Sequence, residues 1–158
     1  MKLKKLMEDI APLLGEDNHD ILLRCANLVM NNVANNYGDF IEKQTFNVKN
    51  GKITYGRFKH NLLKIKSVKS GGREIQYDLF IGYICVPCGK VEVEYACVPR
   101  FKTGNEQIPG GLADILAVGI MKEYSAISDM READTYAKMF EKLMYLARQK
   151  GKSMVMPC

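Results

Sequence analysis

The stretch from residue 109 to residue 149 places strong constraints on the fold, because apolar residues recur there at helical spacing in two consecutive segments. In the first segment the apolar positions run around most of the helix, at Leu112, Ala113, Ile115, Leu116, Ala117, Val118, Gly119, Ile120, Met121, Tyr124 and Ile127, and leave a thin polar stripe of Asp114, Lys122 and Ser125. A helix of this kind needs neighbours on several sides. Pro109 and the two following glycines mark its start. The rest of the chain is therefore expected to pack around it.

The second segment has a single apolar face, formed by Ala133, Tyr136, Ala137, Phe140, Met144 and Ala147. Only residues 128–130 separate the two segments, which predicts an antiparallel helical hairpin. Two further helices are predicted before residue 38. The first covers residues 2–14, with an irregular end at Pro12. The second covers residues 21–37, with Asn18 or Asp20 as its cap.

Between residues 41 and 99 the apolar residues alternate with polar ones, as in strands with one exposed side. Val91, Val93, Tyr95 and Cys97 show this alternation most clearly. Asn50-Gly51 is a strong hairpin signal between residues 45–48 and 53–55. Further turns are predicted at residues 71–72 and 87–89. About six short strands in meander order result.

The predicted fold class is therefore α+β, a four-helix unit with an inserted antiparallel β meander. Residues 1–149 form a single domain in this interpretation, with helices in 2–38 and 109–149 and the β insertion at 41–99. Residues 150–158 lack helical periodicity and are expected to form an extended C-terminal tail.

Composition narrows the function classes. No apolar run approaches the roughly 20 residues of a membrane span, and the basic N-terminus soon turns acidic, unlike a secretory signal. Five cysteines, an odd number spread along the chain, are typical of reduced thiols and not of a secreted disulfide framework. An intracellular protein without a membrane partner is expected.

Cys85-Val-Pro-Cys88-Gly89 has the spacing of a zinc knuckle, in which a turn directs two thiolates at one metal. A closed tetrahedral site needs two more ligands, and the chain has no second pair with this spacing. Cys85 and Cys88 are thus weak metal candidates, and a turn with small buried thiols is the alternative. A redox pair would need a helix after the first cysteine, whereas strands are predicted on both sides.

The sequence offers no catalytic constellation. Nothing in the spacing pairs His19 or His60 with a cysteine, and Glu92 and Glu94 resemble the wet side of a strand more than an acid–base pair. The glycine pairs lack the lysine and hydroxyl residue of a phosphate-binding loop. We expect neither enzymatic activity nor a cofactor.

Positive charge is concentrated in residues 41–73, which hold nine lysines and arginines against one acid, although the whole chain has a net charge of +5. The segment is a possible contact for DNA or for a protein partner, through Lys49, Lys52, Arg57, Lys59, Lys64 and Lys66. With aromatic residues nearby, residues 49–73 would suit a small nucleic-acid-binding regulator. A solvated sheet face or a charged protein contact is the favoured interpretation, since no recognition helix or RNA-binding signature accompanies the segment.

Several short motifs resemble those of the neck adaptors of tailed bacteriophages, the head–tail connector or tail-tube-A-like proteins. The resemblance covers the Pro, Ala and Leu pattern of residues 109–117, then Glu123-Tyr124, then residues 132–143. It extends to the layout before them, a helix at 21–37, a hairpin at 46–55 and a strand at 91–95. Gly110-Gly111 and the Cys85–Cys88 turn have no counterpart in that pattern.

The resemblance implies a structural virion protein, located at the head–tail interface and in the host cytoplasm during assembly. Such adaptors form a homo-oligomeric ring that joins the portal protein to tail or neck proteins and lines the channel of the packaged DNA. Their C-terminal tails often reach onto the portal. By position, the portal-binding residues here would be Lys150, Lys152, Met154, Val155, Met156 and Pro157.

Overall fold

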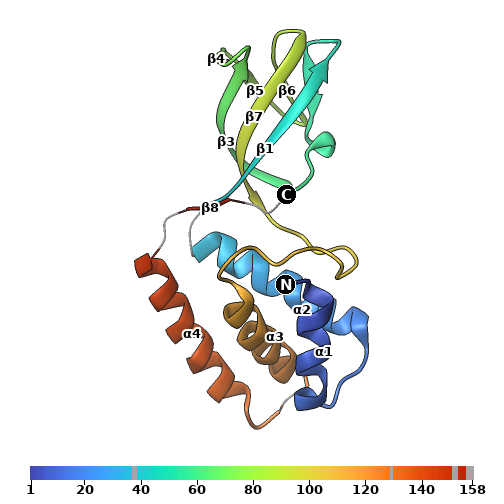
Figure 1. Ribbon diagram of the computed structural model, residues 1–158, viewed down its shortest axis with the longest axis vertical. Helices are drawn as coiled ribbons and strands as arrows, with labels where there is room; N and C mark the ends of the chain where they lie inside the picture. The colour runs from blue at the N-terminus through green and yellow to red at the C-terminus, as the bar shows by residue number, and fades with distance from the viewer. Residues whose placement is uncertain (37–38, 129, 151–152, 156–158) are drawn as a thin grey trace. The chain divides into compact units, whose positions relative to one another are not determined.

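The computed structural model describes residues 1–36, 39–128, 130–150 and 153–155, and the chain forms two compact units. The helical unit comprises Met1–Asp39 and Pro99–Cys158, and the β unit comprises Phe40–Val98. The described parts of the chain contain four helices and eight strands, and β1 to β7 form the antiparallel ladders of two small sheets (Figure 1). The predicted α+β class, with two helices before the strands and two after them, is confirmed.

The helical unit is built around α3 (Ala113–Ile127). This helix packs against α1 (Leu3–Leu14), α2 (His19–Asn36) and α4 (Ala133–Lys150), as its nearly continuous apolar surface predicted. Figure 1 shows α3 lying beside α4 and α2 within this unit. Gly119 lies where these helices approach closely, because a Cβ built there would be 2.6 Å from Cγ1 of Val29.

Local signals explain most helix ends. Asn18 caps α2, since its Oδ1 accepts a hydrogen bond from the backbone N–H of Asp20 at 3.0 Å. Gly15, at φ +66°, ends α1, and Pro12 is accommodated inside its last turn. Two expectations were wrong. Pro109 opens a turn, with α3 beginning four residues later, and Ser125 is fully buried, although it was assigned to a polar stripe.

The connector before α3 is held by side chains that bond to backbone. The side-chain amide of Asn27 makes two hydrogen bonds to the backbone of Phe101. Its Nδ2 donates to the carbonyl at 2.9 Å, and its Oδ1 accepts from the N–H at 2.8 Å. The Glu106 carboxylate accepts N–H groups from Lys102, Thr103 and Gly104, at 2.6 Å for the first of them. Burial alone would raise the pKa of Glu106, but these backbone donors outweigh it and lower the pKa.

We expect Glu106→Gln to reduce stability at pH 7 by roughly 1 kcal/mol, a small value because solvent screens this partly exposed group. The pKa of Glu106 is lowered in the folded state, so its contribution is present above the unfolded pKa and is lost as the pH falls through the folded one. The difference between wild type and variant should therefore shrink below about pH 4.3, the ordinary glutamate pKa. Urea unfolding at a series of pH values measures it. A difference that persists unchanged at low pH would contradict this account.

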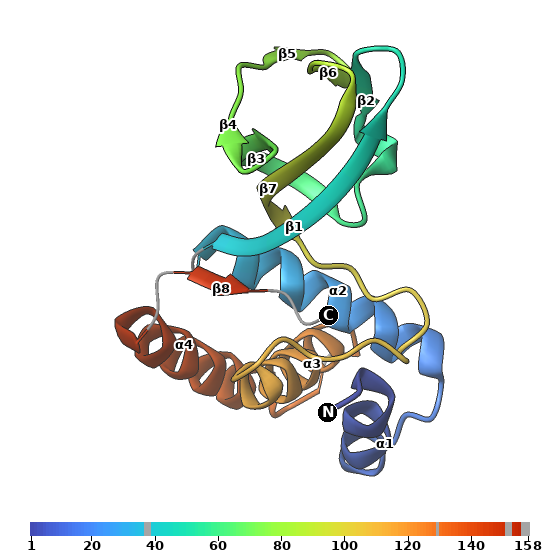
Figure 2. The same cartoon turned by 45° about the horizontal axis from the view of Figure 1, so that its top comes forward.

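The β unit contains two sheets. The first has the order β4-β3-β7-β1, and the second has the order β2-β6-β5. Their bounds are β1 (Asp39–Val48), β2 (Lys52–Thr54), β3 (Asn61–Ser70), β4 (Arg73–Glu74), β5 (Asp78–Phe80), β6 (Tyr83–Cys85) and β7 (Gly89–Val98), with a short 3-10 helix, η1 (Tyr55–Arg57), after β2. Figure 2 shows β1 and β7 running side by side. The chain's last described segment is the short strand β8 (Ser153–Val155).

The strand order is not that of a meander, and the predicted Asn50-Gly51 hairpin is wrong. β1 pairs with β7, ending at Val48 opposite Gly89, and β2 pairs with β6, beginning at Lys52 opposite Cys85. The turns predicted at residues 49–51 and 87–89 are thus two facing corners of one bent ladder. The backbone N–H of Val86 donates across the bend to the carbonyl of Gly51 at 3.0 Å.

The core of the β unit lies between these strands and centres on Phe58, just after η1. Its ring is 5.0 Å from that of Phe46 and 4.8 Å from that of Tyr95. Apolar residues from both sheets complete this core, namely Val48, Ile53, Ile65, Val68, Ile84, Val91 and Val93. β7 is the central strand, and its last residues from Tyr95 to Val98 are buried on both faces, where one wet side was expected.

Candidate functional site

Cys85 and Cys88, the two metal candidates, lie at and beside the bend of the ladder. Cys85 ends β6, whereas Cys88 lies in the corner, exposed, with its Sγ 3.5 Å from the carbonyl oxygen of Lys49. Both are free thiols. Within the described residues, no group of three or more His, Cys, Asp or Glu side chains is placed to hold a metal ion. The structure therefore brings no further ligand to this pair from the part of the chain that it describes.

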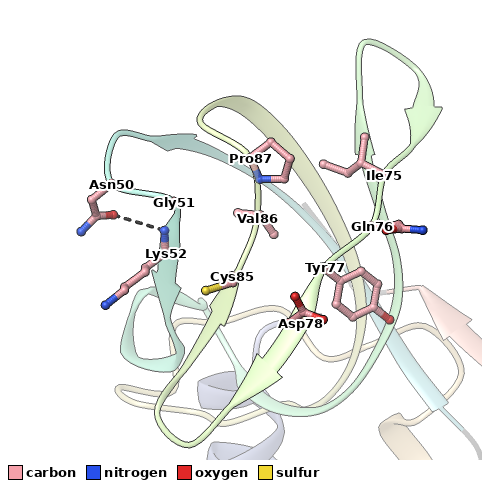
Figure 3. A pocket seen from close by; sticks show the side chains of 10 residues that line it. All are labelled: Asn50, Gly51, Lys52, Ile75, Gln76, Tyr77, Asp78, Cys85, Val86 and Pro87. Carbon is pink, nitrogen blue, oxygen red and sulfur yellow. Dashed lines mark hydrogen bonds between the residues drawn. The ribbon is translucent and has the colours of Figure 1, made fainter.

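Cys85 is the centre of a row of three side chains across the second sheet. Lys52 of β2 and Asp78 of β5 both lie opposite it in register, so the three share one face of the sheet. An open pocket of about 760 Å3 borders this row (Figure 3). It is lined by Asn50, Gly51, Lys52, Ile75, Gln76, Tyr77, Asp78, Cys85, Val86 and Pro87. With one cation, one carboxylate, two amides and no histidine, it provides polar contacts but no acid–base pair for a thiol.

The end of β5 and the turn to β6 expose three consecutive large apolar side chains. Leu79 is 61% exposed, Phe80 48% and Ile81 fully exposed. We call residues 79–82 the apolar tip. The sequence pattern did not indicate this exposure, because a Leu-Phe-Ile run before a glycine is also typical of a buried strand end.

The apolar tip is held firmly by its neighbours. Tyr55 of η1 donates twice to it, from its hydroxyl to the carbonyl of Phe80 at 2.7 Å and from its N–H to the carbonyl of Gly82 at 3.1 Å. The ring of Phe80 stacks on Tyr83 at 5.2 Å, and Nζ of Lys52 lies 4.7 Å from the centre of the Tyr83 ring. An apolar turn with this support presents a fixed shape to solvent.

The six residues of the predicted basic patch lie on several elements of the β unit. Lys49 and Lys52 flank the corner after β1, Arg57 and Lys59 lie in and after η1, and Lys64 and Lys66 lie on β3. The β unit has ten Lys and Arg against five Asp and Glu, which equals the +5 of the whole chain and leaves the helical unit neutral.

Acidic residues divide this basic surface. Glu94 of β7 lies between β1 and β3, and Nζ of Lys43 is 3.8 Å from its carboxylate. Glu92 lies opposite Lys69 in the ladder between β7 and β3. The two glutamates therefore act as cross-strand partners of lysines and not as an acid–base pair.

A polar cluster inside the β unit has a structural role. Oε1 of Gln44 accepts from the Tyr95 hydroxyl at 3.1 Å and from the N–H of Lys59 at 3.0 Å, while its Nε2 donates to the carbonyl of Arg57 at 2.9 Å. Burial raises the pKa of Tyr95 to about 12. The amide thus joins the segment after η1 to β1 and β7.

His60 and Cys97 also belong to the β unit, but they do not form a nucleophilic pair. Nε2 of His60 lies 3.4 Å from Oε2 of Glu42, within ion-pair distance but without the geometry of a hydrogen bond. Burial, assisted by the nearby Glu42 carboxylate, raises the pKa of Cys97 to about 12. Cys97 is therefore a neutral thiol near pH 7, which is the unreactive form.

The predicted portal-binding tail is described only in part. Lys150 is the last residue of α4, and Met154 and Val155 belong to the short strand β8. Lys152, Met156 and Pro157 lie outside the described residues.

No family model matches this chain, and no curated protein matches it. Among the described helices, none combines the length and the apolar character needed to cross a membrane.

Proposed function

We propose that the protein is a structural component of a tailed phage or prophage, an adaptor that assembles as a ring between the portal and the tail or neck. The observation that carries this proposal is the architecture. A packed helical unit is interrupted between α2 and α3 by a β unit, and this order of helices and strands is the one found in the adaptors that the sequence resembles. Residues 46–55 depart from that pattern, because they form a bend in one ladder and not a hairpin.

The distribution of charge and of apolar surface supports the same role. The net charge of the chain resides in the β unit, as expected for a protein beside packaged DNA, while the helical unit is neutral. The apolar tip exposes side chains that a protein contact would cover. Gln44 and Tyr95 are hydrogen-bonded to each other inside the β unit, and Cys97 is buried there.

Binding to the portal protein of the encoding phage or prophage tests this proposal. We expect the chain to co-elute with portal rings in size-exclusion chromatography with light scattering. Deletion of residues 151–158, which leaves α4 complete, should weaken this binding about tenfold or more, as the loss of an anchoring segment does. Portal rings that elute without the chain at micromolar concentrations would reject the proposed function.

A nucleic-acid-binding regulator is the second candidate, favoured by the net charge of the β unit and by the exposure of its lysines. It predicts DNA or RNA affinity that falls steeply with salt, by roughly one power of the salt concentration for each phosphate neutralised. Filter binding from 50 to 200 mM salt measures this slope, roughly the range over which such contacts lose most of their affinity. A flat response would eliminate this candidate.

A further inference from the structure

The apolar tip needs an explanation that the fold of a single chain does not give. Three large apolar side chains in sequence, exposed at the end of β5 and on the turn after it, lose the free energy that burial would provide. Isolated exposed apolar residues are ordinary, but a contiguous group marks an interaction site. Tyr55 holds the backbone of the tip and Tyr83 holds the Phe80 ring, so little backbone entropy would be lost on binding.

Lys52 lies beside the tip and belongs to a basic segment of the β unit, while Asp78 directly precedes the tip. From residue 49 to residue 60 the chain has four cations and no acid. These cations are Lys49, Lys52, Arg57 and Lys59. Lys52 contacts the ring of Tyr83, and Phe80 of the tip stacks on that same ring. A partner surface for the tip should therefore combine an apolar hollow with acidic side chains.

The helical unit has a surface of this description at the corner between α1 and α2. A pocket of about 440 Å3 there has an apolar wall formed by Met7, Ala11, Pro12 and Leu22. Glu8, Glu16 and Asp17 also line it. From residue 6 to residue 23 the chain has five acids and neither lysine nor arginine.

We propose that the apolar tip of one copy of this chain inserts into the α1–α2 pocket of a second copy. Ile81 and Phe80 would enter against the apolar wall, and Lys52 would face Glu8 and Asp17 at the rim. The tip and the pocket are different surfaces of the same chain, so each copy offers one and receives the other. Such a head-to-tail contact adds copies in one direction and closes into a ring when the rotation allows it. This inference rests on the proposed function, since it names the contact by which the ring would assemble.

Two variants test the two sides of this contact one at a time. Ile81→Asp places a charge on the tip, and Glu8→Lys with Asp17→Lys reverses the charge at the rim of the pocket. All three positions are exposed, so both variants should keep the wild-type urea midpoint. Ile127→Asp is the matched control, because Ile127 is an equally large exposed side chain at the end of α3, away from the pocket lining.

Sedimentation velocity over concentrations up to about 1 mM measures the association. Wild type and Ile127→Asp should assemble alike, and each of the two contact variants should associate at least about tenfold more weakly, as expected for loss of a central contact. An equimolar mixture of the contact variants should form a heterodimer and stop there, because it retains one intact tip and one intact pocket that match. A contact between two tips would not be rescued in this mixture.

Three results would overturn the proposal. They are a wild-type chain that stays monomeric at every concentration, contact variants that assemble like wild type, and a mixture that stays monomeric. Binding of wild type but not Ile81→Asp to anionic phospholipid vesicles, in place of self-association, would assign the tip to a membrane surface and would also overturn it. Portal binding is measured separately, so a failure of this contact is distinguishable from a failure of the adaptor function.

Discussion

Gly119→Ala is expected to destabilise the protein by about 1–3 kcal/mol, the usual cost of forcing an extra methyl group into a packed core. The new Cβ would lie 2.6 and 2.7 Å from the two γ-carbons of Val29 and 3.0 Å from Cε2 of Phe140. Val29 is β-branched and cannot turn away without leaving its preferred rotamer. Relief would require α3 to move away from α2 and α4. Urea unfolding monitored by circular dichroism measures the loss.

The sign of the effect is what makes this prediction informative. An unobstructed Gly→Ala change inside a helix stabilises by about 0.5–1 kcal/mol. Gly110→Ala is a suitable control, because Gly110 lies in the same unit, its φ is not in the left-handed region, and a Cβ there would meet no atom within 4 Å. Gly110→Ala should be nearly neutral. If Gly119→Ala were also neutral or stabilising, the close approach of the three helices would be wrong.

The case of α3 shows how far periodicity predicts the helical unit. A nearly continuous apolar surface correctly indicated that this helix has neighbours on several sides. The pattern could not indicate the distance between the helices, which depends on Gly119 facing Val29 across them. The same limit explains Ser125, which looks like a surface residue in the sequence but is buried, with no partner for its Oγ among the described residues.

The sequence predicted that residues 41–99 form antiparallel strands, but it did not predict which strands pair with each other. Asn50-Gly51 does bend the chain, with Gly51 at φ +71°, but the chain does not fold back on itself there. A turn signal reports only the backbone of its own residues, whereas the partner of each strand is chosen by segments far away in the sequence. Here Val48 meets Gly89 and Lys52 meets Cys85, so two predicted turns became facing corners of one ladder.

The candidate site was the least predictable part. Charge could be counted, and the basic segment does lie in the β unit, yet the acids Glu92 and Glu94 that divide it become neighbours of the lysines only when β7 lies between β1 and β3. The apolar tip could not be separated from a buried strand end by composition. Its exposure follows from its place on a turn at the end of the short strands β5 and β6.

Phe58→Ala is expected to cost about 3–5 kcal/mol, the usual range for removing a buried phenylalanine ring. Phe58 is 7% exposed and contacts the rings of Phe46, Tyr55 and Tyr95, so its loss would leave a cavity at the centre of the β unit. The tilted and edge-on arrangement of these rings adds to the loss. Urea unfolding measures the change, with tyrosine fluorescence as the signal.

Phe80→Ala is the matched control, since it makes the same chemical change in the same unit at a ring that is 48% exposed and stacks only on Tyr83 among the aromatic contacts of the described residues. It should cost less than about 1 kcal/mol of stability, as most surface substitutions do. Phe80→Ala should nevertheless weaken self-association, although it leaves the fold intact. A Phe80→Ala loss as large as that of Phe58→Ala would show that the tip is needed for folding. Its exposure would then need no second copy to explain it.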